Sequence, residues 1–195
     1  MKSIYKCTFK NKNFDCVICL NADMPDAARL DKIKHLPILA ADGAALRLMK
    51  LGITPDFVIG DLDSFFENDL SKNYCCDKII HLPDQNSNDF EKILNFAICK
   101  KMTNCLIIGF HGGELEHTLN NWSVLMKYSK KLNLCLLDRG RYGIPISNSI
   151  IFPTKKDEMI SLIPQTEVIL TSKNLVWELH REPLKLGWRE GARNR

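Results

Sequence analysis

Short apolar segments alternate with segments of helical periodicity through about the first 140 residues. The clearest predicted helix begins at Asn88, after which apolar residues recur from Phe90 to Ile98 at the spacing of one helix face. Further helices are predicted over about 44–51 and about 115–128, the last with Leu119, Trp122 and Met126 on one stripe. This alternation predicts an α/β fold with an open, doubly wound, mostly parallel sheet. The predicted strands are Cys16–Leu20, Ile38–Ala41, Phe57–Gly60, Lys78–Leu82, Leu106–Gly109 and Leu132–Leu137.

The pattern changes near residues 139–145, where glycine and proline interrupt it. Beyond that point, short strand-like segments are separated by prolines and no helical period persists. We therefore predict two domains: an α/β domain over residues 1–143, and a smaller all-β, sandwich-like domain over residues 144–195. About 50 residues bury little surface alone, so this domain should pack on the first domain or on another subunit. Its predicted strands are Ser149–Phe152, Met159–Ile163, Glu167–Thr171 and Val176–Leu179.

Composition narrows the choice of function classes. The 195 residues are 45% hydrophobic and 26% charged, which is typical of a folded globular protein. A net charge of +4 favours an anionic ligand only weakly and is not the concentrated basic footprint of a nucleic-acid binder. Because no apolar run approaches about 18 residues, no membrane span is predicted. We expect small-molecule partners, with no nucleic acid and no membrane.

The cysteines and the N-terminal residues indicate in which cellular compartment the protein is expected. Residues 1–6 lack the apolar core of a signal peptide, so we expect a cytoplasmic protein with reduced thiols. Cys16 and Cys19 form a single C-x-x-C pair inside an apolar predicted strand. With no second pair to complete a zinc site, these two are predicted to be core residues.

Acidic residues follow four successive predicted strands. The carboxyl ends of parallel strands share one edge of the sheet, so we expect these side chains to converge there. One Asp after a strand more often holds a turn or caps a helix, but the repetition favours a site. Crowded carboxylates repel and need a cation, and oxygen ligands favour Mg²⁺ with a substrate phosphate. This indicates phosphoryl or pyrophosphoryl transfer. The residues are Asp42, Asp61, Asp63, Asp84, Asp89, Glu114 and Glu116.

Four segments, taken in order, resemble the thiamine pyrophosphokinase family. Together they extend over about residues 16–140, and a weaker match continues at Thr171–Leu179. The resemblance implies a homodimer. Residues 1–143 would be the α/β catalytic domain that binds the nucleotide and Mg²⁺, and residues 144–195 would be a thiamine-binding β-sandwich domain that is incomplete at its C-terminus. The resemblance also implies transfer of pyrophosphate from ATP to the thiamine hydroxyl, giving thiamine diphosphate and AMP. The four segments are Ala41–Leu48, Pro55–Ser64, Pro83–Lys92 and Gly109–Asn121.

The family pattern implies roles for particular carboxylates. Asp61, Asp63 and Asp89 would hold Mg²⁺ and the triphosphate and serve in catalysis, with Asp42 nearby. Glu116 would lie near Mg²⁺ and the thiamine hydroxyl. The base that accepts the hydroxyl proton is not identified: Asp89 and Glu116 are both candidates, and His117 is a third.

The resemblance also implies binding residues. Gln85 would contact ATP or thiamine, and Trp177 would stack on the cationic thiamine ring across the dimer interface. Packing of Trp177 inside the β domain is the alternative. Ser87, Gly112 and His117 complete the expected binding set, although His117 more often orients the helix that follows the glycine pair.

Three departures from the family pattern keep a second class of function open. Glu114 stands where the family has Arg, Glu116 stands where it has Asp, and the sequence ends at Arg195, before the family's last strands. These departures motivate a catalytically impaired thiamine- or nucleotide-binding protein of the same fold. A nucleotide-sugar transferase that uses Asp61 and Asp63 is a third hypothesis, which leaves the other motifs unexplained.

Overall fold

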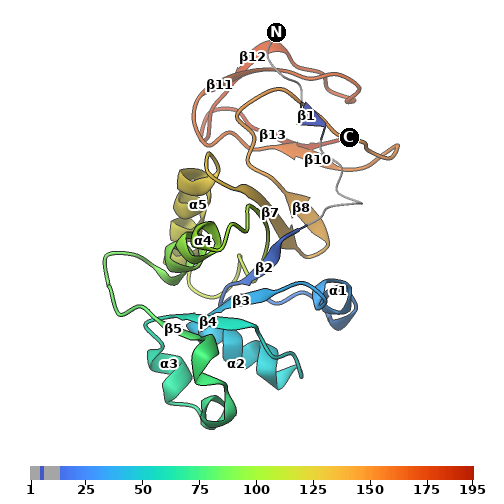
Figure 1. The fold of residues 1–195 in the computed structure, drawn as a ribbon. Helices are drawn as coiled ribbons and strands as arrows, with labels where there is room; N and C mark the ends of the chain where they lie inside the picture. The colour runs from blue at the N-terminus through green and yellow to red at the C-terminus, as the bar shows by residue number, and fades with distance from the viewer. Residues whose placement is uncertain (1–4, 7–13) are drawn as a thin grey trace. The chain divides into compact units, whose positions relative to one another are not determined.

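The computed structural model describes residues 5–6 and 14–195, which form two compact units (Figure 1). The first unit contains residues 14–149, and the second contains residues 150–195 together with Tyr5–Lys6. We predicted the boundary after Gly143, whereas the units divide after Ser149. The chain continues in the first unit beyond Gly143, and Ile144 is partly buried against the core of that unit.

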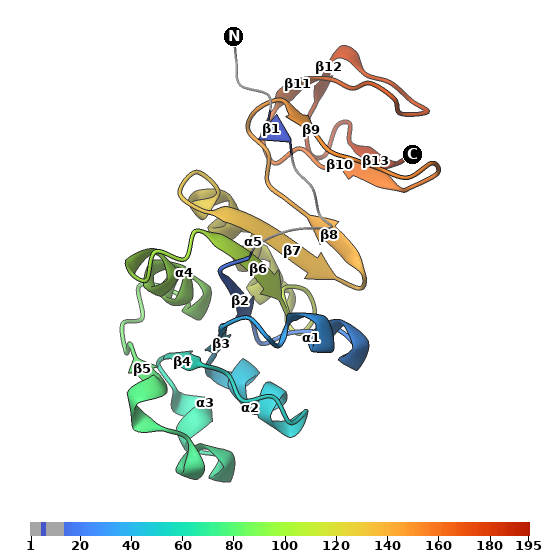
Figure 2. The ribbon, with the colours of Figure 1, turned by 45° about the vertical axis from the view of Figure 1, so that its right-hand side comes forward.

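The first unit is built around a seven-stranded sheet in the order β5-β4-β3-β2-β6-β7-β8. Six strands are parallel, and β8 runs antiparallel to β7. Helices α1 and α4 lie on opposite sides of the sheet (Figures 1 and 2), which confirms the predicted fold class. The strands are β2 (Cys16–Cys19), β3 (Ile38–Ala41), β4 (Phe57–Gly60), β5 (Ile79–His81), β6 (Asn104–Ile108), β7 (Asn133–Asp138) and β8 (Arg141–Gly143).

The central strands are apolar along their whole length because helices cover both faces of the sheet. All four residues of β2 are fully buried, including Cys16 and Cys19, which confirms that these two belong to the core. Both are free thiols, and the Cys16 sulfur lies 3.7 Å from that of Cys105 on β6. Burial of the C-x-x-C pair leaves it no room to act as a surface metal or redox site.

The three predicted helices are present, and one of them differs in its buried face. Helix α4 begins as predicted, because the Asn88 side chain accepts a hydrogen bond from the Glu91 amide at 2.8 Å. On α5, Leu119 of the predicted stripe is 60% exposed, and the buried residues are Val124, Leu125 and Tyr128. The helices are α1 (Ala27–Ile33), α2 (Asp42–Lys50), α3 (Asp63–Phe66), α4 (Asp89–Cys99) and α5 (Leu115–Tyr128), with 3₁₀ turns at Asp69–Asn73 and Cys76–Lys78.

The second unit contains only strands and loops. Its strands form three two-stranded sheets: β1 with β9, β10 with β13, and β11 with β12. The strand predicted at Val176–Leu179 is wrong: residues 174–177 form bends, and the Trp177 amide donates to the Asn194 side chain at 3.2 Å. The strands are β1 (Tyr5–Lys6), β9 (Ile150–Ile151), β10 (Ile160–Leu162), β11 (Val168–Thr171), β12 (His180–Leu184) and β13 (Gly191–Asn194).

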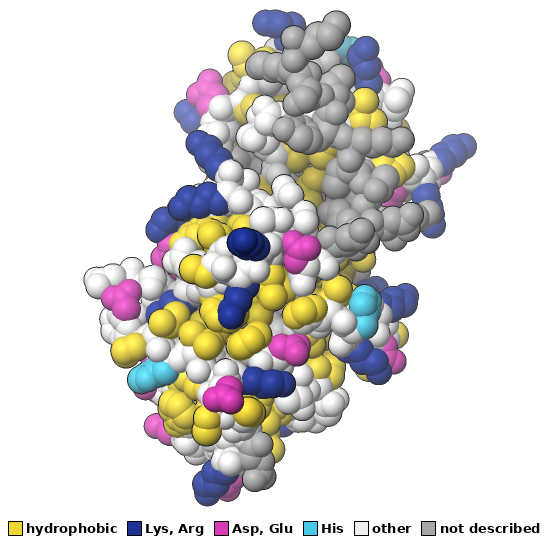
Figure 3. All heavy atoms as spheres, in the orientation of Figure 1, with side chains coloured by type: hydrophobic (Ala, Val, Ile, Leu, Met, Phe, Trp, Pro, Cys, Tyr) yellow, Lys and Arg dark blue, Asp and Glu magenta, His cyan; other side chains and the backbone are white. Residues whose placement is uncertain are grey.

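The surface of the first unit carries charges of both signs. On the face in Figure 3, basic and acidic side chains are interspersed, as the small net charge implies. Among the described residues, no helix has the length and apolar character needed to cross a membrane.

Candidate functional site

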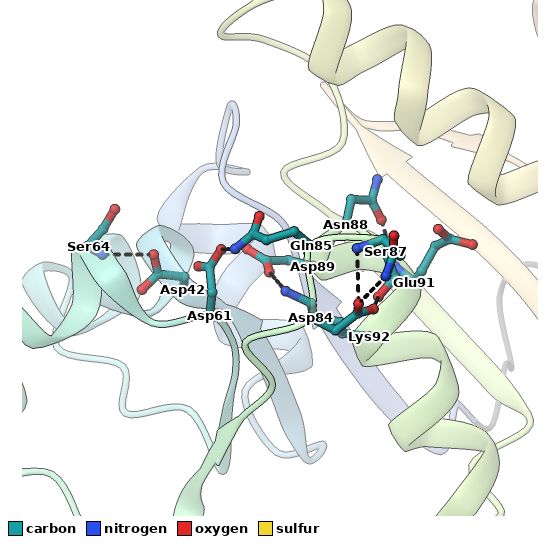
Figure 4. Close-up of polar contacts among 11 residues, drawn as sticks. Asp42, Asp61, Ser64, Asp84, Gln85, Ser87, Asn88, Asp89, Glu91 and Lys92 are labelled. Carbon is teal, nitrogen blue, oxygen red and sulfur yellow. Dashed lines mark hydrogen bonds and ion pairs between the residues drawn. The ribbon is translucent and has the colours of Figure 1, made fainter.

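Three carboxylates meet at the carboxyl edge of the sheet (Figure 4). Asp42 directly follows β3, Asp61 directly follows β4, and Asp89 is the first residue of α4. A methyl group on Gly60, the last residue of β4, would place its carbon 2.9 Å from Asp89 Oδ1 and 3.3 Å from Asp42 Cβ. Asp42 and Asp89 therefore approach each other over a glycine that leaves room for both. We call Asp42, Asp61 and Asp89 the acidic cluster.

Asp42, the first residue of α2, is hydrogen-bonded to the start of α3. Its buried carboxylate accepts hydrogen bonds from the backbone amides of Ser64 at 3.1 Å and Phe65 at 2.7 Å. Burial raises the pKa of Asp42 above its ordinary value; these amides act in the opposite direction, and the charge of Asp61 adds to the rise. Asp42 thus caps the start of α3 and orients the segment that carries Asp61 and Asp63.

The charge of Asp89 is influenced by burial and by three charged neighbours. Burial is the largest cause of its raised pKa, and the charges of Asp61 and Asp42 raise it further. The Lys92 ammonium opposes this rise and lies 3.5 Å from Asp89 Oδ1. The carboxylates of the cluster therefore repel one another, and an additional cation would reduce this repulsion.

The loop after β5 contributes an amide to the cluster. Gln85 Nε2 donates to Asp61 Oδ2 at 3.2 Å, so Gln85 lies beside one of the predicted metal ligands. Asp84 makes its hydrogen bonds within its own loop. Its exposed carboxylate accepts hydrogen bonds from the backbone amide and the side chain of Asn86 and from the Ser87 hydroxyl. These hydrogen bonds lower the pKa of Asp84. Asp84 and Ser87 thus form a turn of their own, contrary to our expectation that Asp84 joins the cluster.

The other predicted carboxylates, Asp63 and Glu116, are exposed. Asp63 is exposed at the first residue of α3, and Glu116 is exposed in the first turn of α5. His117 Nε2 lies 3.2 Å from Glu114 Oε2 on the same helix. Within the described chain, no hydrogen bond or ion pair connects Asp63, Glu116 or His117 to the acidic cluster.

The glycine loop after β6 packs against the loop after β2. Gly112 has φ of +106°, and a Cβ atom there would collide with the Asp23 carboxylate. The Asp23 amide donates to the His111 carbonyl at 2.8 Å, and Arg139 Nη2 donates to Asp23 Oδ2 at 2.9 Å. These loops flank the point where the strand order reverses, the usual ligand crevice of such sheets. We did not single out Asp23 from the sequence, although it follows a predicted strand as the other acids do.

Trp177 lies in the second unit and is 60% exposed. Its carbonyl accepts from Asn194 Nδ2 at 2.7 Å, and its amide donates to Asn194 Oδ1. Asn194 is itself buried. The buried Asn194 thus fixes the backbone of Trp177, while the indole ring stays at the surface of this unit. The alternative in which Trp177 packs inside the β domain is wrong.

The carboxylates of the cluster suit a Mg²⁺ site that is completed by substrate phosphates. They do not suit a metal site that is formed by protein side chains alone. Within residues 5–6 and 14–195, no three His, Cys, Asp or Glu side chains are arranged to hold a metal ion by themselves. Mg²⁺ is usually bound through one or two carboxylates plus the phosphates of a substrate. Asp61 and Asp89, with the Gln85 amide close by, supply the hard oxygen ligands of such a site.

The fold and this acidic edge define an open α/β protein, a class in which ligands usually bind at the carboxyl ends of the strands. Residues 33–136, just over half of the chain, match the model of a family described as "Thiamin pyrophosphokinase, catalytic domain". The chain belongs to the thiamin pyrophosphokinase family. This confirms the predicted family and the prediction that the chain is an enzyme of the transferase class.

Individual relatives agree with the family model. The chain is 26% identical over 165 residues to thiamin pyrophosphokinase 1 of Caenorhabditis elegans, covering 76% of this chain and 67% of the relative. It is 26% identical over 162 residues to thiamine pyrophosphokinase of Bacillus subtilis, covering 79% and 75%.

Solved structures show the same fold. Thiamin pyrophosphokinase from Candida albicans superposes with a TM-score of 0.81 at 16% identity, covering 98% of this chain and 86% of that one. The Bacillus subtilis enzyme gives a TM-score of 0.72 at 19% identity, covering 92% and 88%.

Proposed function

We propose that the chain catalyses the Mg²⁺-dependent transfer of pyrophosphate from ATP to the hydroxyl of thiamine, giving thiamine diphosphate and AMP. Membership of the family supports the reaction class. The observation that carries the proposal is the acidic cluster, in which Asp42, Asp61 and Asp89 meet at the carboxyl edge of the sheet. Carboxylates this close are typical of a site that is completed by a cation and a phosphate chain.

The reaction exchanges one P–O bond for another. The thiamine hydroxyl oxygen forms a bond to the β-phosphorus of ATP. The bond between that phosphorus and the oxygen that bridges to the α-phosphorus breaks, and AMP leaves with the bridging oxygen. The hydroxyl proton passes to a carboxylate, for which Asp89 is the candidate that lies in the cluster.

The residues of the chain would act mainly by holding and orienting the reactants. Asp61 and Asp89 would hold Mg²⁺, and Asp63 is the third proposed ligand. Mg²⁺, when bound, neutralises negative charge on the phosphate oxygens. Asp42 keeps the start of α3 in place through the Ser64 and Phe65 amides. Gln85 orients Asp61 through its side-chain amide.

The thiamine side of the site is proposed to involve a second copy of the chain. The exposed Trp177 ring offers a flat aromatic face that suits a cationic ring. In this proposal the chain is a homodimer in which Trp177 of one subunit covers thiamine bound at the acidic cluster of the other. Ser87, Gly112, Glu116 and His117 remain proposed contacts of the substrates.

The test measures both products. Purified protein with ATP, Mg²⁺ and thiamine should form AMP and thiamine diphosphate in equal amounts, quantified by chromatography. Asp61→Asn and Asp89→Asn should each lower the rate by about 10²-fold or more, because charge stabilisation at the phosphates is lost. Asp31→Asn is the matched control, since Asp31 is an exposed α1 residue paired with Lys34, and it should leave the rate unchanged.

Three outcomes would contradict the proposal. Tight thiamine binding with no AMP formed would favour the catalytically impaired binding protein, the reading that Glu114 motivates. Binding of a UDP-sugar instead of ATP would favour the nucleotide-sugar transferase. Equal activity of Asp61→Asn and wild type would remove the acidic cluster from the reaction.

A further inference from the structure

Leu62 lies between Asp61 and Asp63 in a backbone conformation that leucine rarely adopts. Its φ of 67° and ψ of 18° belong to the left-handed helical region. Glycine enters this region at no steric cost, whereas the Cβ atom of any other residue comes close to the following carbonyl oxygen. Such a residue persists only where the surrounding structure holds it in place. The conformation of Leu62 therefore needs a contact that compensates for its strain.

The compensating contact is the burial of the Leu62 side chain. Leu62 is fully buried in the hydrophobic core of the first unit, whereas Asp63 beside it is exposed. Removal of a whole leucine side chain from water is strongly favourable, so the core can hold the backbone in a strained turn. Leu62 thus anchors the segment that carries two of the proposed metal ligands.

Leu62 also occupies the N-cap position of α3, where a polar side chain usually accepts hydrogen bonds from the first amides of a helix. A leucine side chain cannot do this. The Asp42 carboxylate accepts these hydrogen bonds instead, from the backbone amides of Ser64 (Figure 4) and Phe65. The cap is therefore supplied by a member of the acidic cluster, which leaves the residue at the N-cap position free to anchor the turn in the core.

The chain is fixed on both sides of this turn. Before the turn, β4 pairs with β3 and β5, and the Gly60 carbonyl accepts a hydrogen bond from the Leu82 amide at 2.7 Å. After the turn, α3 is held by Asp42 through the two hydrogen bonds described above. Any other conformation at residue 62 must therefore displace Asp61 or separate α3 from Asp42.

We propose that Leu62 is a positioning residue of the acidic cluster, whose buried side chain holds a left-handed turn that places Asp61 and Asp63 for binding of the metal–nucleotide complex. This inference rests on the proposed function, since it takes that complex as the ligand of the cluster. It follows that the site tolerates a residue that suits both the core and the left-handed turn. A residue that suits only one of them should weaken binding.

The experiment compares two substitutions that keep the apolar character and approximate volume of Leu62. Leu62→Met is unbranched at Cβ and should keep the turn, whereas Leu62→Ile is β-branched, and such residues are outliers in the left-handed region. Binding of Mn²⁺ together with α,β-methylene-ATP, in which the bond to be broken is replaced, is followed by electron paramagnetic resonance. We expect Leu62→Met to bind this complex nearly as wild type does. Leu62→Ile should bind it about tenfold or more weakly, since the ligands lose their orientation.

Further variants separate this role from a general contribution to stability. Leu62→Gly suits the turn but removes the anchor, so it too should bind the complex about tenfold more weakly than Leu62→Met. It also keeps the test decisive if Leu62→Ile does not fold. Leu48 is the matched control, because it is a fully buried leucine within the helix α2. Leu48→Ile and Leu48→Met should bind the complex equally well, with folding of all variants checked by urea unfolding.

The order of the affinities decides the outcome. Equal binding by Leu62→Ile and Leu62→Met would overturn the inference, and so would an equal loss in Leu48→Ile, because any change in the core would then weaken the site. Binding by Leu62→Gly at the wild-type level would show that the anchor is not needed, which also overturns it. If wild type binds the analogue complex but transfers no pyrophosphate, the proposed function fails while this inference is still tested. If wild type binds no such complex, both fail.

Discussion

Gly60 shows how one residue decides the geometry of the acidic cluster. It ends β4, and the space that a side chain would fill there is taken by the Asp89 carboxylate. The Asp89 side chain is the flexible partner, so a methyl group at residue 60 should displace that carboxylate, and it also strains the backbone of β4, because Gly60 has a φ of +159°. The cluster thus depends on the absence of a side chain as much as on its carboxylates.

Gly60→Ala should therefore lower activity and also cost stability. We expect a loss in the rate of thiamine diphosphate formation of about tenfold or more, since a displacement of about 1 Å can cost 10²-fold. The free energy of unfolding in urea should fall by about 1–3 kcal/mol, because alanine is strained at a φ of +159°. Gly143→Ala is the control, because its new Cβ would meet Leu136 at an ordinary 3.6 Å. Equal loss of activity in both variants would contradict this account of Gly60.

At the scale of elements, Asp15 joins the starts of β2 and β6. Its carboxylate accepts from the backbone amides of Thr103 at 2.7 Å and Asn104 at 2.9 Å. Burial acts to raise the pKa of Asp15, but the hydrogen bonds from these two residues outweigh it, so the pKa lies below 3.8. The contribution of Asp15 to stability is therefore complete above about pH 4 and is lost as the pH falls through its lowered pKa.

Asp15→Asn should destabilise the first unit in a pH-dependent way. At pH 7 the free energy of unfolding should fall by about 1 kcal/mol, a value reduced for the partial exposure of the carboxylate. The difference from wild type should shrink as the pH falls below about 4, because the wild-type carboxylate is then protonated. Urea unfolding at several pH values measures both, with Asp69→Asn as an exposed control. A difference that is constant with pH would contradict the prediction.

At the scale of the whole molecule, the proposed dimer makes a prediction that neither unit makes alone. If Trp177 of one subunit serves the acidic cluster of the other, Asp61→Asn and Trp177→Ala damage opposite halves of one site. Each variant alone should then be nearly inactive. After exchange of subunits, mixed dimers contain one intact site, so activity should recover to about a quarter of wild type.

The mixing experiment needs two controls. Light scattering should give a mass twice 22.3 kDa for wild type and for both variants. Asp61→Asn mixed with Asp89→Asn should recover nothing, since both carboxylates belong to the same half of the site. A monomeric wild type, or recovery in that control mixture, would contradict the shared site.

The sequence alone determined the features that are set by local patterns. Apolar runs predicted the strands of the first sheet because both faces of that sheet are buried. The cap at Asn88 predicted the start of α4, and the acids that follow β3 and β4 predicted the edge where a site forms. In a parallel sheet, chain direction alone brings those strand ends together.

Only the tertiary structure decided which side chains meet. Asp84 follows a strand as Asp61 does, yet its own loop supplies enough donors to engage it. Trp177 sits in a segment with a strand-like pattern, yet Asn194, distant in sequence, binds its backbone and leaves the ring exposed. Lys92 occupies a helix position that local pattern assigns to solvent or core alike, and in the structure it is buried. These outcomes depend on contacts between distant segments, which residue spacing along the chain does not encode.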